Sequence, residues 1–520
     1  YLSIFKKIKS INMNLRLSVF IACVVGFVSI SMEIVWFSVI GYLLRGQAGI
    51  FGIVLSLVLF GIAFGAKYGY KKVKLGSENI TSLISKFLLL TGIINFLAFP
   101  LIGWLMTIHE YFAILFIFKI IVISFLVGSI FPLLCHISIP QDEESVGQHT
   151  SWIYAGNIVG ATTGPLFTGF VLIDHFEISY IITALCAVCI LLSILLKWNE
   201  LGVSFLYSKK SVFMLLSLTI MTACFKDLYS NHYELIHFKT NYNNQKFKYI
   251  AENKSGIITV EEDKKGDIFY GGGAYDGRVN IDPENNSNGI DRTYLVAALH
   301  PNPEDVLMIG LSTGSWARIL SDYSKIKSLT IIEINSNYVE LIEKYPEVNT
   351  ILGDDKVSII IDDGRRWLRR NTDKKFDLIV MNTTFHFREH ITNLVSFEFL
   401  KMCQQRLKKE GVMYWNTTHC PDIIYTASNV FSNVTTFKGF VAASDNPFTL
   451  DEETKRLSFL EFKRNGSSIF LKNDKTIRLM NRLISAPLDN IRDSILDQNL
   501  WLITDDNMAS EYKEGVWHKN

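Results

Sequence analysis

The sequence lacks several features that would assign a function directly. It carries 51 Lys and Arg against 50 Asp and Glu, and this balance gives no overall field that would attract a nucleic acid. The seven cysteines are scattered, and the one CxxC spacing, Cys186 and Cys189, lies in an apolar stretch without a histidine nearby. These absences exclude a nucleic-acid binder, a disulfide scaffold and a metal-binding protein from the expected classes.

Long apolar runs, by contrast, fill the first part of the chain. They lie at about 17–44, 48–69, 80–107, 111–139, 151–173, 177–196 and 211–225. All but the last supply the ~20 residues that a helix needs to cross a bilayer. The first run is too long for a cleavable signal peptide. We therefore expect a transmembrane helical domain over residues 1–226 with about seven spans, in the inner or plasma membrane, with the lipid bilayer as a partner.

The side of the membrane that holds the rest of the chain stays open at this stage. Lysines and arginines gather before the first run, after the second, and between the sixth and seventh, which favours a cytoplasmic N-terminus. Seven spans then place the second half outside the cytoplasm. Six spans, with 211–225 lying at the interface, keep it inside.

Within the spans, glycines recur at every fourth position in two places: Gly61, Gly65 and Gly69, and Gly156, Gly160 and Gly164. This spacing lets helix backbones approach closely, so we expect two packing seams. Glu33 is a carboxylate deep in a span, and it is either a functional group or a hydrogen-bonding group between helices. Lys119 either pairs with Glu33 or extends toward the interface.

The pattern changes near Lys226, where the apolar runs end. Residues 227–290 are β-rich, with alternating apolar residues and glycines typical of an antiparallel hairpin unit. From 291 to 520 strands alternate with helices, and an amphipathic helix is expected to end at Gly411. The expected strands are 306–310, 329–335, 357–364, 376–384 and 411–418. The fold class is thus a multi-span α-helical membrane domain fused to a doubly wound, Rossmann-like α/β domain with an N-terminal β-hairpin unit.

Ligands of such sheets bind beyond the carboxyl ends of the strands, so the residues there form the candidate site. Gly310 and Gly314 flank the first turn, where a backbone without side chains lets a nucleoside approach. Glu333 ends the second strand, where a carboxylate can accept hydrogen bonds from two ribose hydroxyls. Asp363 and Gly364 end the third strand, suited to an adenine amino group. Because no GxGxxG and no P-loop lysine are present, the pattern predicts a nucleoside without phosphates.

One tripeptide stands at two later strand ends, as Asn382-Thr383-Thr384 and Asn416-Thr417-Thr418. Its amides and hydroxyls either fix a polar ligand or cap the turns that follow.

The FHFREH segment after the first tripeptide supplies groups for acid–base chemistry and anion binding, namely His386, Arg388 and Glu389. Imidazole titrates close to neutrality, so His386 is the first candidate for a proton acceptor. The alternative is an ordinary exposed histidine on a loop.

At these residues the soluble half resembles the spermidine synthases, the polyamine aminopropyltransferases. The likeness covers roughly 250–420 and rests on YGGGAYDGRVN, HPNPEDVLMIG, EIN and DDGRRW. Through MEIVW, GNIVGATTGPLFTGF and TDDNMASEY, the whole chain is similar to the membrane-fused branch of that family. The resemblance implies decarboxylated S-adenosylmethionine on the glycine turn, with its ribose on Glu333 and its adenine at Asp363. A small amine is the second substrate that such a transferase would use. A homodimer is one open assembly state, and the sequence leaves the oligomeric state undecided.

The chain departs from the family pattern where an amine is bound. Thr313 stands in place of an aspartate that binds the aminopropyl amine, and Asn382 occupies the first position of a DSSDP-type catalytic loop. Asn416 replaces a glutamine after the fifth strand, and a tyrosine-x-glutamate before the first strand is missing. The nucleoside half of the site is thus retained and the amine half is rewritten.

These patterns give three groups of candidate residues. The catalytic candidates are Asn382, His386 and Glu389. The cofactor-binding candidates are Gly310, Thr313, Gly314, Glu333, Asp363 and Gly364. The acceptor-binding candidates are Asn416, Thr417 and Arg388.

Three functions fit the sequence. The first is aminopropyl transfer from decarboxylated S-adenosylmethionine to an altered amine acceptor. The second is an S-adenosylmethionine-dependent methyltransferase, favoured by the loss of the amine-binding aspartate at Thr313. The third is a membrane protein, a sensor or a transport-associated protein, whose soluble domain binds a nucleoside without catalysis.

Overall fold

The computed structural model describes residues 13–75, 79–139, 143–382 and 385–513. The chain divides into two compact units. The first comprises Tyr1–Leu43, Gly49–Lys246 and Glu252–Lys254, and the second comprises Leu44–Ala48, Phe247–Ala251 and Ser255–Asn520. The first unit therefore extends beyond the predicted boundary at 226. It does so because helix α9 (His232–Phe238) packs against α3 (Ile80–Ile108).

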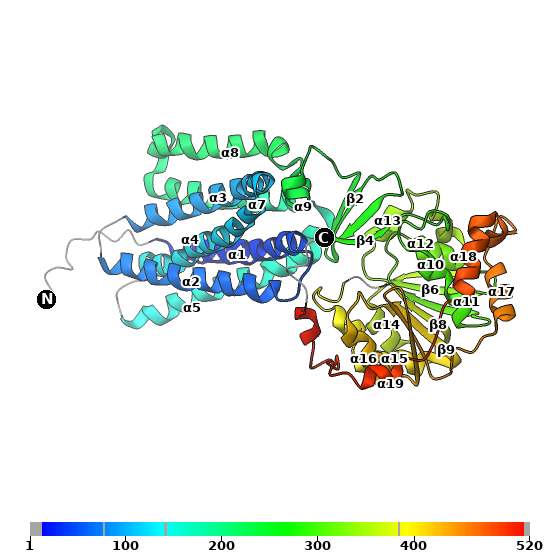
Figure 1. Ribbon diagram of the computed structural model, residues 1–520. Helices are drawn as coiled ribbons and strands as arrows, with labels where there is room; N and C mark the ends of the chain where they lie inside the picture. Colours follow the sequence, from blue (N-terminus) through cyan, green and yellow to red (C-terminus); the bar gives the residue numbers. More distant parts are fainter. Residues whose placement is uncertain (1–12, 76–78, 140–142, 383–384, 514–520) are drawn as a thin grey trace. The chain divides into compact units, whose positions relative to one another are not determined.

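The first unit consists of long helices that run alongside one another (Figure 1). Besides α3 and α9, its main helices are α1 (Leu15–Leu43), α2 (Ile50–Leu75), α4 (Ile114–Ser138), α5 (Glu143–Phe167), α7 (Ile178–Leu201) and α8 (Lys209–Tyr229). Within the described residues, seven helical segments are long and apolar enough to cross a membrane, matching the predicted runs. The last predicted run is longer than expected, at 21 residues, because Ser208 caps its start and the helix continues to Tyr229.

The two predicted glycine seams are confirmed as helix contacts. Gly61, Gly65 and Gly69 of α2 face α4, and Gly156, Gly160 and Gly164 of α5 face α1. A Cβ on Gly65 would lie 2.2 Å from the carbonyl oxygen of Phe125, and one on Gly160 would lie 1.8 Å from that of Cys23. Only glycine permits this backbone approach.

Lys119 lies among aromatic rings. Its ammonium is 5.6 Å from the ring centre of Trp36 and 5.9 Å from those of Phe99 and Phe116, and the residue is 6% exposed. In the described part of the chain no ion pair joins Lys119 to Glu33. The first of the two alternatives, pairing with Glu33, is therefore wrong, and cation–π attraction stabilises the ammonium instead.

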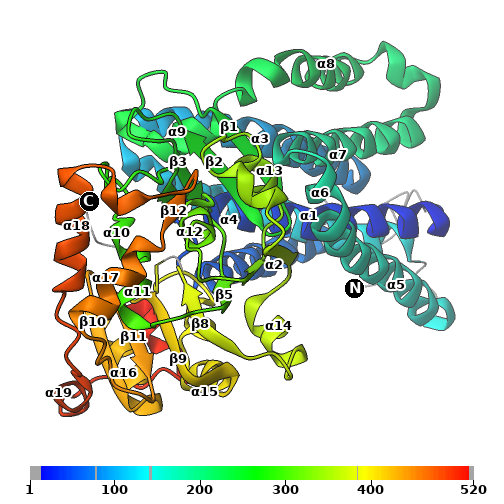
Figure 2. The ribbon, with the colours of Figure 1, turned by 90° about the vertical axis from the view of Figure 1, so that its right-hand side faces the viewer.

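The second unit begins with a four-stranded antiparallel sheet in the order β1-β2-β3-β4. Its strands are β1 (Tyr249–Asn253), β2 (Gly256–Glu261), β3 (Ile268–Gly271) and β4 (Ala274–Arg278). This confirms the hairpin unit, but not its start, because residues 232–238 are helical and the first strand begins at Tyr249. The sheet lies beside α13 (Asn337–Ile342) (Figure 2). The ring of Phe269 packs nearly parallel to that of Tyr338, with the ring centres 6.5 Å apart.

A seven-stranded sheet forms the centre of the second unit, in the order β10-β11-β9-β8-β5-β6-β7. The strands are β5 (Asp305–Ile309), β6 (Ser328–Glu333), β7 (Val357–Ile361), β8 (Phe376–Met381), β9 (Leu407–Asn416), β10 (Asn433–Phe437) and β11 (Phe440–Ser444). The five from β5 to β9 pair in parallel, and β11 is antiparallel to β9 and to β10. The sheet is therefore doubly wound, and its order reverses between β5 and β8.

Helices cover both faces of this sheet (Figure 1). One face carries α10 (Asp291–Tyr294), α11 (Val296–Leu299), α12 (Ser315–Ser321), α13, α17 (Glu452–Leu460) and α18 (Asp474–Ile484). The other carries α14 (Gly364–Arg370), α15 (Phe397–Arg406) and α16 (Pro421–Val430), and α19 (Arg492–Leu496) packs on α16. Alternate residues of each strand enter the two cores, so Val306 and Met308 pack on the first face and Leu307 and Ile309 on the second.

The prediction that Gly411 ends a helix is wrong. Helix α15 ends at Arg406, and Gly411 lies inside strand β9. The lysine-rich stretch after Arg406 is extended because Leu407 pairs with Phe376 of β8 and the Lys408 ammonium bonds to Asp305 and Asp377. Pairing across the sheet here overrides the local preference for a helix.

Candidate functional site

A cavity of about 260 Å³ lies at the carboxyl ends of the parallel strands, where the strand order reverses. Its walls come from the β2–β4 hairpins, the ends of β5, β6 and β7, and the segment that follows β8. Seven of the predicted site residues line it: Gly310, Glu333, Asp363, Gly364, Asn382, Arg388 and Glu389. This is the place where doubly wound sheets bind ligands.

The turn after β5 leaves space in the cavity because Gly310 has no side chain. Gly310 has a φ of +89°, and the nearest atom to a Cβ placed there would be the Asn382 carbonyl oxygen at 3.6 Å. Gly314, with a φ of +74°, faces Ile342 and Val348 instead of the cavity. The Thr313 hydroxyl lies 3.3 Å from the Arg278 carbonyl oxygen, to which it donates. Thr313 and Gly314 thus shape the turn but are not among the described residues that line the cavity.

Backbone amides fix the Glu333 carboxylate at the end of β6. Its Oε2 accepts from the Leu311 amide at 2.7 Å and its Oε1 from the Asn335 amide at 2.8 Å. A carboxylate has about four lone-pair sites in all, so it can still accept from a ligand. The residue is 4% exposed, and this burial raises the pKa of Glu333 to about 7 although the backbone amides of Asn335, Leu311 and Ile334 favour the ionised form.

At the end of β7, Asp363 and Gly364 form the start of helix α14. The Asp363 side chain caps this helix by accepting from the Arg366 amide at 2.6 Å. A Cβ on Gly364 would lie 2.7 Å from Cγ2 of Ile309, so glycine is needed for α14 to approach β5.

The segment after β8 brings Arg388 and Glu389 to the cavity. Its backbone pairs with Leu44–Ala48, which belongs to this same unit: the Ala48 amide donates to the Phe387 carbonyl at 3.0 Å and the Glu389 amide donates to the Gly46 carbonyl at 2.8 Å. A Cβ on Gly272 in the β3–β4 turn would lie 2.8 Å from Nη2 of Arg388. The guanidinium therefore lies directly against the hairpin unit.

His386 is enclosed. It is 3% exposed, its Nδ1 lies 2.7 Å from the Thr418 hydroxyl, and its Nε2 lies 3.2 Å from the Lys513 carbonyl oxygen. The alternative of an exposed loop histidine is thus wrong. His386 is not one of the described lining residues, and its role as proton acceptor stays a prediction.

The second tripeptide forms a turn. The Asn416 Oδ1 accepts from the Thr418 amide at 2.9 Å, and the Thr417 hydroxyl donates to the Gly439 carbonyl at 2.8 Å. These are the capping bonds of the second alternative. Binding of an acceptor by Asn416 and Thr417 stays a prediction, and Thr383 and Thr384 of the first tripeptide lie outside the described residues.

The TDDNMASEY segment, residues 504–512, forms hydrogen bonds with residues next to the cavity lining. The Asp505 carboxylate pairs with the Arg365 guanidinium and accepts from the Ser396 hydroxyl at 2.8 Å. Glu511 accepts from the backbone amide of Thr392 at 3.1 Å. The C-terminal segment thus contacts Arg365 and Thr392, the chain neighbours of the lining residues Gly364 and Ile391.

The sequence patterns missed other lining residues, chiefly Asp276 of β4 and Tyr338 of α13. The Tyr338 hydroxyl donates to Oδ2 of Asp276 at 2.5 Å. The only available signal was the Ala-Tyr-Asp-Gly-Arg sequence of the hairpin, which places a carboxylate in a glycine-rich β unit. Nothing local indicates that this unit folds over the strand ends.

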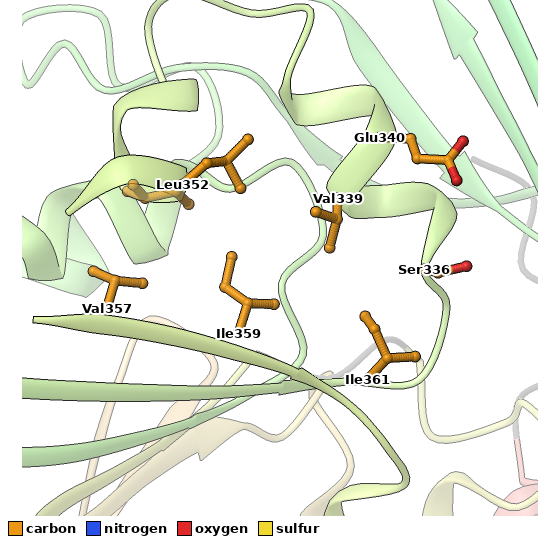
Figure 3. A pocket seen from close by; sticks show the side chains of 8 residues that line it. Ser336, Val339, Glu340, Leu352, Val357, Ile359 and Ile361 are labelled. Carbon is orange, nitrogen blue, oxygen red and sulfur yellow. The ribbon is translucent and has the colours of Figure 1, made fainter. Parts of the chain in front are cut away.

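A second hollow, of about 390 Å³, lies beside the edge strand β7. Figure 3 shows Val357, Ile359 and Ile361 directed from the strand toward Val339 and Leu352. Its polar lining is limited, within the described chain, to Ser336 and Glu340. This mostly apolar surface provides few groups for catalysis or polar ligand binding.

Part of the second unit is similar to known proteins. Residues 293–444 match the profile described as "Spermine/spermidine synthase domain". The polyamine aminopropyltransferase of Streptococcus uberis is 39% identical over 119 residues, covering 23% of this chain and 41% of that protein. The corresponding protein of Agathobacter rectalis is 33% identical over 124 residues, covering 24% and 43%. The chain thus spans about two fifths of the length of these curated relatives.

Among solved structures, a spermidine synthase in complex with the transition state analogue AdoDATO aligns with 48% of this chain and 89% of its own, at 20% identity and a TM-score of 0.38. The spermidine synthase of Thermotoga maritima aligns with 48% of this chain and 87% of its own, at 20% identity and a TM-score of 0.37.

Proposed function

We propose that this chain, whose C-terminal part contains a spermine/spermidine synthase domain, is a membrane-bound aminopropyltransferase. It would transfer the aminopropyl group of decarboxylated S-adenosylmethionine to an amine through a diverged acceptor site. The observation that carries the proposal is Glu333, a buried carboxylate that lines the cavity at the end of β6 and is fixed there by backbone amides. Gly310 on one side and Asp363 on the other supply the remaining parts of a nucleoside site.

The reaction follows from the chemistry of a sulfonium. The lone pair of the acceptor nitrogen attacks the propyl carbon bonded to sulfur, and the carbon–sulfur bond breaks with its electrons passing to sulfur. The products are the neutral thioether 5′-methylthioadenosine and an alkylated ammonium, which loses one proton to a base. Glu389 is the candidate for that base because its carboxylate lines the same cavity as Asn382, whose amide cannot take a proton at neutral pH. His386 remains a second candidate, and Arg388, Asn416 and Thr417 remain the predicted acceptor side.

An S-adenosylmethionine-dependent methyltransferase is the second candidate function. It is favoured by Thr313, which leaves the first turn without a carboxylate for an aminopropyl ammonium. The same cavity would then hold the carboxylated form of the cofactor. A nucleoside-binding membrane protein without turnover is the third candidate.

Calorimetric titration of the full chain in detergent micelles tests the proposal. We expect decarboxylated S-adenosylmethionine to bind more tightly than S-adenosylmethionine. The reverse order would assign the chain to the methyltransferases. If neither compound gives heat, and a thermal melt shows that the protein is folded, the nucleoside site itself is contradicted.

Two variants test the proton acceptor. We expect Glu389→Gln to lower kcat about a hundredfold or more, the usual effect of losing a general base, and to leave 5′-methylthioadenosine binding unchanged. His386→Ala should have the same effect only if imidazole is the base. Full activity in either variant would show that the replaced residue is not the general base. Steady-state kinetics gives kcat, and calorimetry shows whether nucleoside binding is unchanged.

The pH dependence of nucleoside binding is set by Glu333. Only the ionised carboxylate accepts from both ribose hydroxyls, and burial raises its pKa to about 7. Protons therefore compete with the ligand below that pH. The dissociation constant of 5′-methylthioadenosine, which carries no amine chain, should rise by up to tenfold for each pH unit below about 7 and stay level above it. Titrations from about pH 5.5 to about pH 8 check this, and a flat profile would contradict the assignment.

A further inference from the structure

We propose that Asp276 supplies the carboxylate that the first turn lacks at Thr313, and that it binds the primary ammonium of the donor substrate. This inference rests on the proposed function and adds a specificity-determining residue to it. Asp276 would make the site select a decarboxylated, and hence doubly cationic, nucleoside.

Strand β4 carries Asp276 to the turn in question. The Ser312 hydroxyl donates to the Asp276 carbonyl oxygen at 2.9 Å, which joins β4 to the turn directly before Thr313. A Cβ on the next residue, Gly277, would lie 2.9 Å from the Ser312 hydroxyl oxygen and 3.2 Å from Cγ2 of Thr313. The Asp276 side chain lines the same cavity as Gly310 and Ser312, the turn residues that precede Thr313.

The Asp276 side chain is oriented by a buried phenol. Tyr338 donates to Oδ2 at 2.5 Å, and its ring is parallel to that of Phe269 with centres 6.5 Å apart. Burial raises the pKa of Tyr338 well above its ordinary value, and the carboxylates of Asp276 and Glu333 add to the effect, so the phenol keeps its proton. A fixed donor on one oxygen leaves Oδ1 for a ligand. Asp276 itself is half-buried, which lets it meet a ligand in the cavity.

The charges around the cavity suit a cation. Its described lining includes the carboxylates of Asp276, Glu333, Asp363 and Glu389, against the guanidinium of Arg388, while the lining residue Asp362 is paired with Arg366. Decarboxylated S-adenosylmethionine carries a sulfonium and a primary ammonium, both attracted by this surface. S-adenosylmethionine adds a carboxylate beside its ammonium, and Asp276 would repel that group. One residue thus both attracts the decarboxylated donor and disfavours the carboxylated one.

The test is Asp276→Asn in the full chain, titrated with three nucleosides. Asparagine keeps an oxygen that can accept from Tyr338, so the fold is retained while the charge is removed. We expect binding of decarboxylated S-adenosylmethionine to weaken about tenfold to a hundredfold, as for the loss of a charge-assisted hydrogen bond. Binding of 5′-methylthioadenosine, which has no ammonium, should change less than about twofold, and the preference over S-adenosylmethionine should shrink.

Asp263→Asn is the matched control. This carboxylate belongs to the same β unit, but it pairs with Arg278 and does not line the cavity. It should leave all three affinities unchanged. Tyr338→Phe, which frees the Asp276 carboxylate, should weaken only the ammonium-bearing nucleosides.

The outcomes separate this inference from the proposed function. Equal loss of all three ligands in Asp276→Asn would give the residue a structural role only and overturn the inference. Unchanged affinity of Asp276→Asn for decarboxylated S-adenosylmethionine would also overturn the inference. The proposed function would still stand if the wild-type chain prefers that compound over S-adenosylmethionine. A wild-type chain that binds none of the three nucleosides would overturn both.

Discussion

Replacing Glu333 by alanine is expected to abolish measurable binding of every nucleoside named above. The carboxylate would accept two hydrogen bonds from ribose hydroxyls, and hydrogen bonds to a charged group contribute about 1.5–3 kcal/mol each. Their joint loss corresponds to a weakening of roughly a hundredfold to ten-thousandfold. Isothermal calorimetry with 5′-methylthioadenosine measures the effect without contributions from an amine.

Alanine also leaves the amides of Leu311 and Asn335 without their carboxylate acceptor. Buried donors left unpaired cost about 1–3 kcal/mol each, so the melting temperature must be measured beside the affinity. Glu333→Gln is the sharper variant, because its amide oxygen can still accept one of the two backbone bonds. Undiminished binding in a folded Glu333→Gln protein would place the nucleoside elsewhere.

A single added methyl group at Gly160 should destabilise the helical unit strongly. The Cβ of Gly160→Ala would lie 1.8 Å from the carbonyl oxygen of Cys23, where no flexible side chain can move aside. Helices α1 and α5 would have to separate along their seam, at a cost of about 3 kcal/mol by analogy with overpacked cores. Thermal unfolding in detergent micelles should register a clear drop in melting temperature.

Gly52→Ala provides the control for this experiment. Gly52 is also in an apolar helix, but no atom lies within 4 Å of the position that a Cβ would take there. Alanine at this position should be neutral or slightly stabilising, because it has the higher helix propensity by about 1 kcal/mol. Similar melting temperatures for the two variants would contradict the seam between α1 and α5.

Elements with strong local periodicity could be predicted from the sequence. The apolar runs correspond to helices, and the strand-end residues Gly310, Glu333 and Asp363 do share one cavity. Their spacing along successive parallel strands was sufficient, because a parallel sheet brings the carboxyl ends of its strands to one edge.

Features that depend on contacts between distant segments could not be predicted. Gly411 was expected to end a helix, but pairing with β8 sets the strand there. His386 is buried by the Thr418 hydroxyl and by the C-terminal segment, neither of which is apparent from the FHFREH sequence. Asp276 reaches the cavity because a separate sheet folds over the first turn, and no periodicity encodes that approach.

The pairing of Leu44–Ala48 with residues 387–389 has a consequence for any dissection of the protein. This short connection is covalently tethered at both ends, to the last turn of α1 and the first turn of α2. A fragment that starts at Phe247 keeps every residue that lines the cavity but loses the backbone partners of Phe387 and Glu389. Such a fragment would keep the strand ends but hold residues 387–389 less firmly. If the proposed transferase activity were assayed on it, low turnover would report the missing backbone partner of this segment and would not by itself contradict the proposed function.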